Sequence, residues 1–214
     1  MFDLAPPALL FSQHFTTDFV GDEVLTINER KATGQFSGKR LKDFSTGRYC
    51  ARKALAHIGL ENADILVGDE KQPLWPAGYV GSISHSGKLI GAVAAKSSQV
   101  KSIGLDIETI GKIKPEMWRL LYTKAETEFL KSFTGEELAY YTTLLFSFKE
   151  AFYKLQYPLT KTFLDFTDVE IKSVGNKFKL GVLKEFSGKQ LLSGNLSLHH
   201  TSKKDQLITL CYLM

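Results

Sequence analysis

The sequence contains the run Phe146-Ser147-Phe148-Lys149-Glu150-Ala151-Phe152-Tyr153-Lys154-Leu155, which is rich in residues that favour helices. Steps of three and four residues place one apolar face on it and on the residues just before it, formed by Leu138, Tyr141, Leu145, Phe148, Phe152 and Leu155. We therefore expect a helix over residues 136–156, ended by Pro158. Glu150 and Lys154 lie four positions apart beside that face, a spacing that fits a surface ion pair and equally the working end of a site.

The length and composition indicate a folded protein. A chain of 214 residues allows one large domain or two small ones, and 43% hydrophobic residues are enough for a proper core. No apolar run approaches the ~20 residues that span a bilayer, and residues 1–10 make a poor signal peptide. Cys50 and Cys211 form no metal-binding spacing. We therefore expect a reduced, cytoplasmic protein without stable membrane insertion.

Positive charge is concentrated in one segment. Between Arg30 and Lys53, eight basic residues stand against one acidic residue, Asp43, so that eight minus one gives +7, compared with +4 for the whole chain. Such a segment fits an anionic partner, namely nucleic acid, a phosphorylated small molecule or an acidic protein, and it also fits a solvated helix face.

Residues 37–58 predict a helix, or two short helices because Gly47 interrupts the pattern. Arg48 and Arg52 are four positions apart and project from the same side. Two guanidinium groups arranged in this way can grip a phosphate with forked donors. Their long stems can equally cover apolar surface while the charged ends meet water.

Residues 80–95 predict two strands joined by a turn at residues 86–88. Small hydroxyl residues such as Ser84 let a ligand approach the end of the first strand. His85 shares its side of that strand with Ile83, so it also fits a core histidine. A similar pattern recurs at residues 195–211 and hints at two related halves.

Two carboxylates follow each other along a predicted strand at residues 102–108. Asp106 and Glu108 point to one side, and Ile103, Leu105 and Ile107 point to the other. Paired carboxylates repel and need a counter-charge. Mg²⁺, bound together with phosphate oxygens, is a common solution, although acids near a strand end can also be solvated and idle.

Local patterns predict the remaining elements. The run Thr123-Lys124-Ala125-Glu126 has the capping-box pattern of a helix start, which explains Glu126 structurally and assigns it no chemistry. Alternation around residues 169–171, 178–180 and 196–199 predicts strands of one antiparallel sheet. A turn at residues 203–205 should precede the last strand.

Four motifs occur in order: Gly47-Arg48-x-x-Ala51-Arg52, Trp75-Pro76-x-Gly78-x-x-Gly81-Ser82-Ile83-Ser84-His85, Gly104-Leu105-Asp106-Ile107-Glu108 and Phe146-Ser147-x-Lys149-Glu150-x-x-x-Lys154. Their order and spacing resembles the 4′-phosphopantetheinyl transferases of the larger, single-chain class (surfactin and enterobactin synthetase component D-like). The resemblance implies an α+β fold of two similar halves in a pseudo-twofold arrangement, residues 1–105 and 106–214. Coenzyme A would lie between the halves, and His199 would be the inert counterpart of His85.

The resemblance also implies a reaction. Coenzyme A would donate its 4′-phosphopantetheine arm to a serine of an acyl or peptidyl carrier protein, and adenosine 3′,5′-bisphosphate would leave. The carrier would present an acidic helix beside that serine. We expect a monomer that serves siderophore, nonribosomal peptide or polyketide biosynthesis.

Residue roles carry over by position within the motifs. The resemblance assigns coenzyme A binding to Arg48, Arg52, Lys71, Gln72, Pro73, Ser84, His85, Asp106 and Lys154. It assigns Mg²⁺ to Asp106, Glu108 and Glu150. Glu150, directly or through a metal-bound water, would be the base for the serine hydroxyl, and Lys154 would stabilise or protonate the leaving phosphate. Phe148 replaces the small residue usual in the family, which we interpret as a packing variant.

Other functions compete with this hypothesis. A Mg²⁺-dependent phosphodiesterase or nucleotidase would use the same three carboxylates and release its product to water. A nucleic-acid-binding module would use the basic segment, but it gives no reason for three carboxylates to converge. A serine hydrolase built on Ser84 and His85 lacks the Gly-x-Ser-x-Gly elbow.

Overall fold

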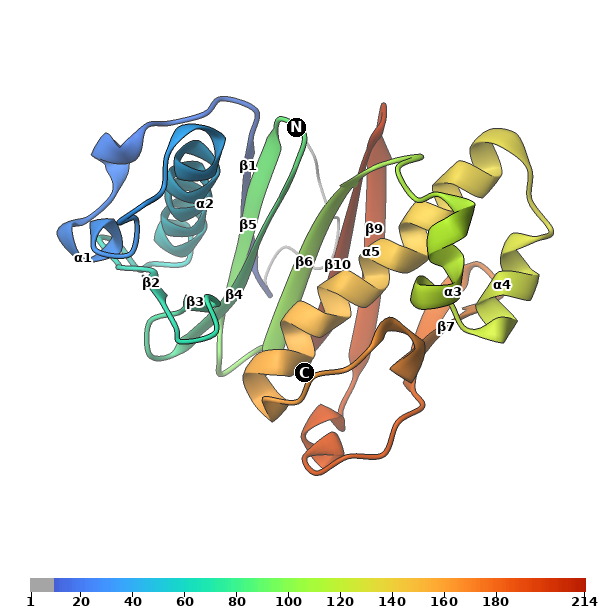
Figure 1. Ribbon diagram of the computed structural model, residues 1–214. Helices are drawn as coiled ribbons and strands as arrows, with labels where there is room; N and C mark the ends of the chain where they lie inside the picture. The colour runs from blue at the N-terminus through green and yellow to red at the C-terminus, as the bar shows by residue number, and fades with distance from the viewer. Residues whose placement is uncertain (1–9) are drawn as a thin grey trace.

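Two antiparallel sheets form the centre of the molecule in the computed structural model, which describes residues 10–214 (Figure 1). The first sheet has the order β1 (Ser12–Thr16), β5 (Leu89–Lys96), β4 (Tyr79–Ser86). The second has the order β6 (Ser102–Thr109), β10 (Gln206–Leu213), β9 (Leu196–Lys203). Two small antiparallel pairs lie outside them: β2 (Leu66–Val67) with β3 (Pro73–Leu74), and β7 (Val169–Val174) with β8 (Lys177–Val182).

Two long helices, α2 (Gly38–Ala56) and α5 (Gly135–Thr160), accompany the two sheets. The shorter helices are η1 (Asp22–Val24), α1 (Ile27–Arg30), η2 (Pro115–Met117), α3 (Trp118–Leu121), α4 (Lys124–Leu130), η3 (Phe166–Asp168) and η4 (Lys189–Leu192). None of the helices between residues 10 and 214 combines the length and apolar character needed to cross a membrane.

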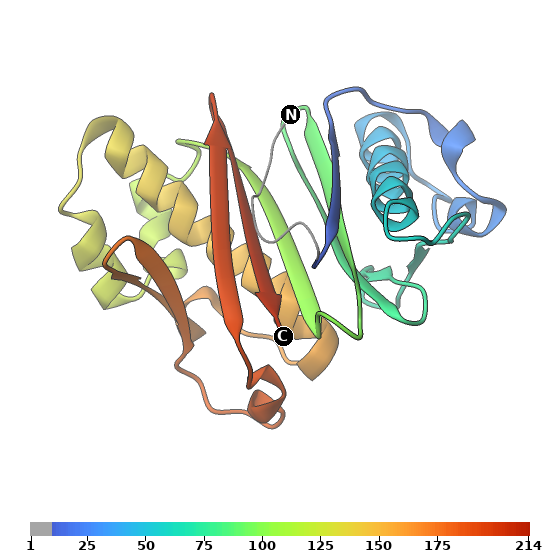
Figure 2. The same cartoon turned by 180° about the vertical axis from the view of Figure 1, so that it is seen from behind.

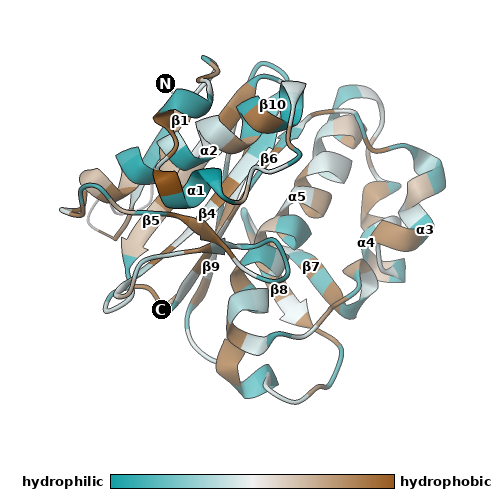
Figure 3. Ribbon diagram, turned by 60° about the vertical axis from the view of Figure 1, so that its left-hand side comes forward, coloured by the Kyte–Doolittle hydropathy of each residue, from teal (hydrophilic) through white to brown (hydrophobic). Residues whose placement is uncertain are grey.

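The elements stack in the order α2, first sheet, second sheet, α5 (Figures 1 and 2). Alternation along β5 explains this layering. Ala92 and Ala94 pack against α2, whereas Val93 and Ala95 join a core shared with β6 and β10. On the far side, the predicted apolar face of α5 packs on the second sheet. Apolar and polar residues succeed one another along α5 (Figure 3), as expected for a helix with one buried face.

The two halves repeat one arrangement, which confirms the predicted α+β fold of similar halves. Hairpin β4–β5 has two eight-residue strands and a two-residue turn, and hairpin β9–β10 has the same lengths. In each half a long helix packs on the second hairpin strand and on a further strand, β1 or β6. Aligning the hairpins at their turns pairs His85 with Ser202 and pairs His199 with Ser82. The expectation that His199 is the counterpart of His85 is therefore wrong.

The change from one half to the other lies before β6. This strand pairs with β10 along its whole length, from Ser102 to Thr109. A boundary after residue 105, as expected from the sequence, would cut through that strand. Sheet pairing instead places the changeover in residues 97–101, between β5 and β6.

Tertiary contacts change three local predictions. Helix α2 runs unbroken through Gly47, where an added Cβ would lie 3.0 Å from Ile83 Cγ2, so the glycine allows close packing on β4 and does not end the helix. Helix α5 continues past Pro158 and ends where Lys161 turns left-handed, at φ 51°. Strands β7 and β8 form their own pair, so the C-terminal strands do not make one sheet.

Candidate functional site

Helix α5 lies against strand β6 with matched spacing. Every second residue of β6 meets every fourth residue of α5, in the pairs Ser102 with Leu155, Gly104 with Ala151, and Asp106 with Ser147. At Gly104 the backbones approach so closely that an added Cβ would lie 1.8 Å from the Ala151 carbonyl oxygen. This close contact fixes where Glu150 and Lys154, on the flank of α5, stand relative to the carboxylates of β6.

Asp106 is the centre of the polar cluster. Its side chain is almost completely buried, at 4% exposure. Oδ1 accepts hydrogen bonds from Lys154 Nζ at 2.7 Å and from Ser84 Oγ at 3.1 Å, and Oδ2 accepts one from Ser147 Oγ at 2.8 Å. Lys154 Nζ also donates to the Leu105 carbonyl at 3.1 Å. The structure thus brings three predicted site residues, Ser84, Asp106 and Lys154, into direct contact across the two halves.

Three carboxylates share this region. Burial, and next the charge of Asp106, raise the pKa of Glu108 to about 7. Burial raises the pKa of Glu150 as well, and Asp106 adds to this while Lys154 opposes it. The negative charge of Asp106 therefore makes ionisation of Glu108 and Glu150 less favourable, and a bound cation would relieve this repulsion.

The donor chemistry fits a hard divalent cation, because carboxylate oxygens are its preferred ligands. Asp106 already uses both oxygens in hydrogen bonds, one of them to an ammonium group. Among residues 10–214, no three His, Cys, Asp or Glu side chains stand in a metal-binding arrangement. Assembly of a Mg²⁺ site by Asp106, Glu108 and Glu150 therefore requires side-chain movement and stays a prediction.

A cavity of about 550 Å³ opens beside Lys154. The segment Lys71-Gln72-Pro73 lines it from the first half, and Lys154 lines it from α5, so these predicted residues share one space. Tyr153 and Tyr157 also line it, with rings stacked 5.5 Å apart. Sequence reasoning missed these tyrosines, although their spacing of four residues on the same helix was an available signal. Glu150 and Tyr153 line a second cavity, of about 270 Å³.

His85 lies close to charged residues of helix α2 and to the Lys154–Asp106 pair. Its side chain is 48% exposed, so it is not the core histidine that its strand position allowed. Its Nδ1 lies 3.9 Å from Asp43 Oδ2. Burial lowers the pKa of His85, and the nearby charges of Asp43, Lys39, Lys154 and Asp106 act on it as well. The imidazole therefore remains available to a ligand at this edge.

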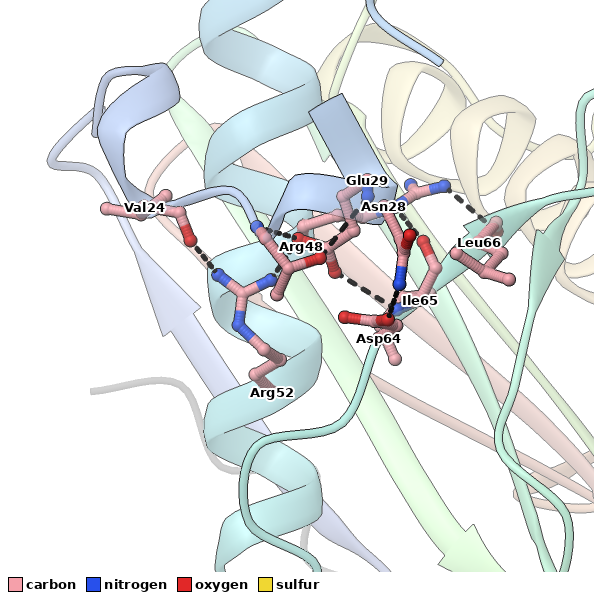
Figure 4. Close-up of polar contacts among 9 residues, drawn as sticks. Val24, Asn28, Glu29, Arg48, Arg52, Asp64, Ile65 and Leu66 are labelled. Atoms are coloured by element: carbon pink, nitrogen blue, oxygen red, sulfur yellow. Dashed lines mark hydrogen bonds and ion pairs between the residues drawn. The ribbon is translucent and has the colours of Figure 1, made fainter. Parts of the chain in front are cut away.

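Arg48 and Arg52 both bind groups within the protein, which argues against the phosphate contacts expected from the sequence. Arg52 binds the Glu29 carboxylate and donates to the Val24 carbonyl at 2.5 Å. Arg48 Nε donates to the Ile65 carbonyl at 3.0 Å, and burial lowers the pKa of Arg48 to about 10. Figure 4 shows both guanidinium groups turned toward the loops that they hold against α2. The motif could not reveal this, because Glu29 lies far upstream in the sequence.

Replacing Arg52 by alanine is expected to destabilise the fold by about 2 kcal/mol, because Glu29 is fully buried and would lose its charged partner. Urea unfolding measures this loss, and an Arg30→Ala variant is the control, since Arg30 pairs only at the surface. The affinity of the folded Arg52→Ala protein for coenzyme A should stay close to wild type. Unchanged stability with weakened coenzyme A binding would restore the phosphate role.

Lys149 precedes Glu150 but serves the fold. Its side chain is 1% exposed, and Nζ donates to Glu126 Oε2 at 2.6 Å, to the Leu121 carbonyl at 2.9 Å and to the Phe166 carbonyl at 2.7 Å. Glu126 also completes the capping box at the start of α4, as predicted. Phe148 is fully buried in the core, which confirms its assignment as a packing residue.

Comparison with known proteins agrees with this arrangement of two halves. A family model described as 4′-phosphopantetheinyl transferase N-terminal domain matches residues 28–95, and one described as 4′-phosphopantetheinyl transferase superfamily matches residues 102–211. The chain is thus an enzyme of the transferase class. It belongs to the 4′-phosphopantetheinyl transferase superfamily.

Similar proteins include 4′-phosphopantetheinyl transferase Svp of Streptomyces mobaraensis, 33% identical over 77% of this chain and 68% of that protein. PptT of Mycobacterium tuberculosis is 38% identical over 62% of this chain and 58% of that protein. Enterobactin synthase component D of Escherichia coli is 32% identical over 81% of this chain and 77% of that protein. Among solved structures, holo-[acyl-carrier-protein] synthase (AcpS) of Thermotoga maritima overlaps 53% of this chain and 63% of that chain, with 19% identity and a TM-score of 0.45.

Proposed function

We propose that this enzyme transfers the 4′-phosphopantetheine group of coenzyme A to a serine hydroxyl of an acyl or peptidyl carrier protein. The observation that carries the proposal is the contact of Lys154 with Asp106, beside Glu108 and Glu150, at the edge of the cavity lined by residues 71–73. This arrangement supports the proposal, because transfer from a pyrophosphate needs a cation and metal-binding acids close together. Adenosine 3′,5′-bisphosphate is the second product.

The residues divide the chemistry between them. The serine oxygen forms a bond to the phosphorus that carries the pantetheine arm, and the bond from that phosphorus to the departing bisphosphate breaks. Glu150 accepts the serine proton, directly or through water, and its raised pKa makes it a better base than an ordinary glutamate. Lys154 neutralises charge on the leaving phosphate. Asp106, Glu108 and Glu150 would hold Mg²⁺, which when bound neutralises pyrophosphate charge.

The substrate-binding residues follow from the same arrangement. Lys71, Gln72 and Pro73 line the cavity that we assign to the adenine side. We assign Ser84, which contacts Lys154, and His85, which lies beside Asp43, to the phosphates. Relatives that carry the name enterobactin synthase support siderophore, nonribosomal peptide or polyketide synthesis as the setting. The acidic helix of a carrier would meet a chain of net charge +4. We expect a cytoplasmic monomer.

A carrier-modification assay tests the proposal. The protein is incubated with coenzyme A, Mg²⁺ and an apo-carrier protein, and the carrier is weighed by mass spectrometry. We expect a gain of one phosphopantetheine group, and no gain on a carrier whose target serine is replaced by alanine. Hydrolysis of coenzyme A with no carrier product would instead identify a phosphodiesterase, and no reaction with any of several carriers would contradict both activities.

A further inference from the structure

Two buried hydroxyl groups connect Asp106 to the neighbouring strand. Thr209 of β10 is the cross-strand partner of Asp106, and its side chain is fully buried. Ser147 of α5 lies over both residues and is also fully buried. Its Oγ is 2.7 Å from Thr209 Oγ1 and 2.8 Å from Asp106 Oδ2. A continuous chain of hydrogen bonds therefore links Thr209, Ser147 and Asp106.

The hydrogen bonds that link Thr209, Ser147 and Asp106 are all donated in one direction, toward Asp106. Asp106 forms an ion pair with Lys154, whose Nζ lies 2.7 Å from Oδ1, and a carboxylate can only accept hydrogen bonds. The Ser147 hydroxyl has a single hydrogen and donates it in the hydrogen bond to Asp106. Thr209 must therefore donate its own proton to Ser147.

Ser147 behaves differently from the other hydroxyl residues of its helix. Thr142 and Thr143 both turn their hydroxyl groups back to main-chain carbonyls four residues earlier, those of Leu138 and Ala139. This back-bonding is the usual choice for serine and threonine inside a helix. Ser147 instead bonds to Asp106 and Thr209, so side chains outside the helix hold its hydroxyl away from the carbonyl of Thr143.

We propose that Thr209 is a positioning residue for the transfer reaction, acting through Ser147 to hold the Asp106 carboxylate in one orientation. With Oδ2 fixed by Ser147, Oδ1 is directed to Lys154 and to the region that Glu108 and Glu150 share. Without the donor at Thr209, the Ser147 hydroxyl is free to turn back to its own helix and Asp106 loses a partner. This inference rests on the proposed function, in which Asp106 contributes to the Mg²⁺ site.

The test compares Thr209→Val, which keeps the shape and removes the donor, with Thr209→Ser, which keeps the donor. Thr142→Val is the matched control, because Thr142 is also buried and its hydroxyl donates to carbonyls of its own helix. Binding of Mn²⁺ in the presence of coenzyme A is measured from the electron paramagnetic resonance signal of the free ion, and thermal unfolding is followed in parallel.

We expect Thr209→Val to weaken Mn²⁺ binding about 10-fold, the lower end of the effect of partners that orient metal ligands. Thr209→Ser and Thr142→Val should stay within about twofold of wild type, well below that effect. In kinetic assays, the Mg²⁺ concentration for half-maximal turnover should rise by the same factor, while turnover at saturating Mg²⁺ recovers. Ser147→Ala provides a second route if Thr209→Val does not fold, and it should weaken Mn²⁺ binding at least as much.

Equal Mn²⁺ affinity in wild type, Thr209→Val and Ser147→Ala would overturn the proposal, and so would a wild-type protein that does not bind Mn²⁺. The role of Thr209 and the proposed transfer function can fail independently of each other. Weakened Mn²⁺ binding in a protein that modifies no carrier would leave the role of Thr209 standing and remove the proposed function. Efficient carrier modification, together with wild-type Mn²⁺ affinity in Thr209→Val and Ser147→Ala, would support the proposed function and remove the role of Thr209.

Discussion

Replacement of Glu150 by glutamine is expected to lower the rate of phosphopantetheine transfer by at least about 100-fold, the lower range for loss of a general base. The amide keeps the size of the side chain but neither accepts the serine proton nor offers an anionic ligand. Folding should be preserved, because burial disfavours the charged form of Glu150 and the neutral amide has the same size. Single-turnover modification of a carrier protein, followed by mass spectrometry, measures the rate.

Glu137→Gln is the matched control for this experiment, since Glu137 is exposed near the start of the same helix. It should transfer at the wild-type rate. If Glu150→Gln also transfers at nearly that rate, with urea unfolding unchanged, Glu150 is neither the base nor an essential ligand, and the assignment of the α5 carboxylate has to be abandoned.

Replacement of Glu126 by alanine is expected to cost about 3–5 kcal/mol of stability, the range for breaking a buried ion pair from one side. Glu126 and Lys149 are both nearly inaccessible to solvent, so the ammonium would remain buried without its anion. The Ile171 main-chain N–H would also lose its acceptor, Glu126 Oε1, which lies 2.7 Å away. Urea unfolding measures the change.

Glu128→Ala on the same short helix provides the comparison, because Glu128 pairs with Lys131 only at the surface and should contribute within about 1 kcal/mol. The double variant Glu126→Ala, Lys149→Met should recover part of the loss, since it removes both buried charges. A loss below about 1 kcal/mol in Glu126→Ala would mean that water reaches the pair and that it does not hold α4 to α5.

Sequence reasoning succeeded where the signal is local. The three- and four-residue spacing of apolar residues predicted α5, the turn at residues 86–88 predicted hairpin β4–β5, and the capping box at Thr123 predicted the start of α4. These features depend on residues that are close together in the chain. The meeting of Ser84, Asp106 and Lys154 was expected through resemblance to a family, because no periodic pattern relates residues from three separate elements.

Sequence reasoning failed where distant residues decide the outcome. The spacing of Arg48 and Arg52 fits a phosphate, but it could not show that Arg52 pairs with buried Glu29 or that Arg48 donates to the Ile65 carbonyl. The sequence left open whether Gly47 divides the helix, and the structure shows one helix in which the absence of a side chain at Gly47 allows close packing against Ile83. The role proposed for Thr209 has no signal in the sequence, since it depends on the pairing of Thr209 with Asp106 between neighbouring strands.

The close contact between β6 and α5 at Gly104 has a consequence for how such an enzyme can diversify. The acidic and basic groups of the site stand on a strand and a helix whose backbones touch, so their relative positions do not depend on the loops. Short connections such as residues 111–114 and 183–188 can therefore change in length and charge while the reacting groups stay in place. Selection can reshape the surface that meets a protein substrate without redesigning the chemistry beneath it.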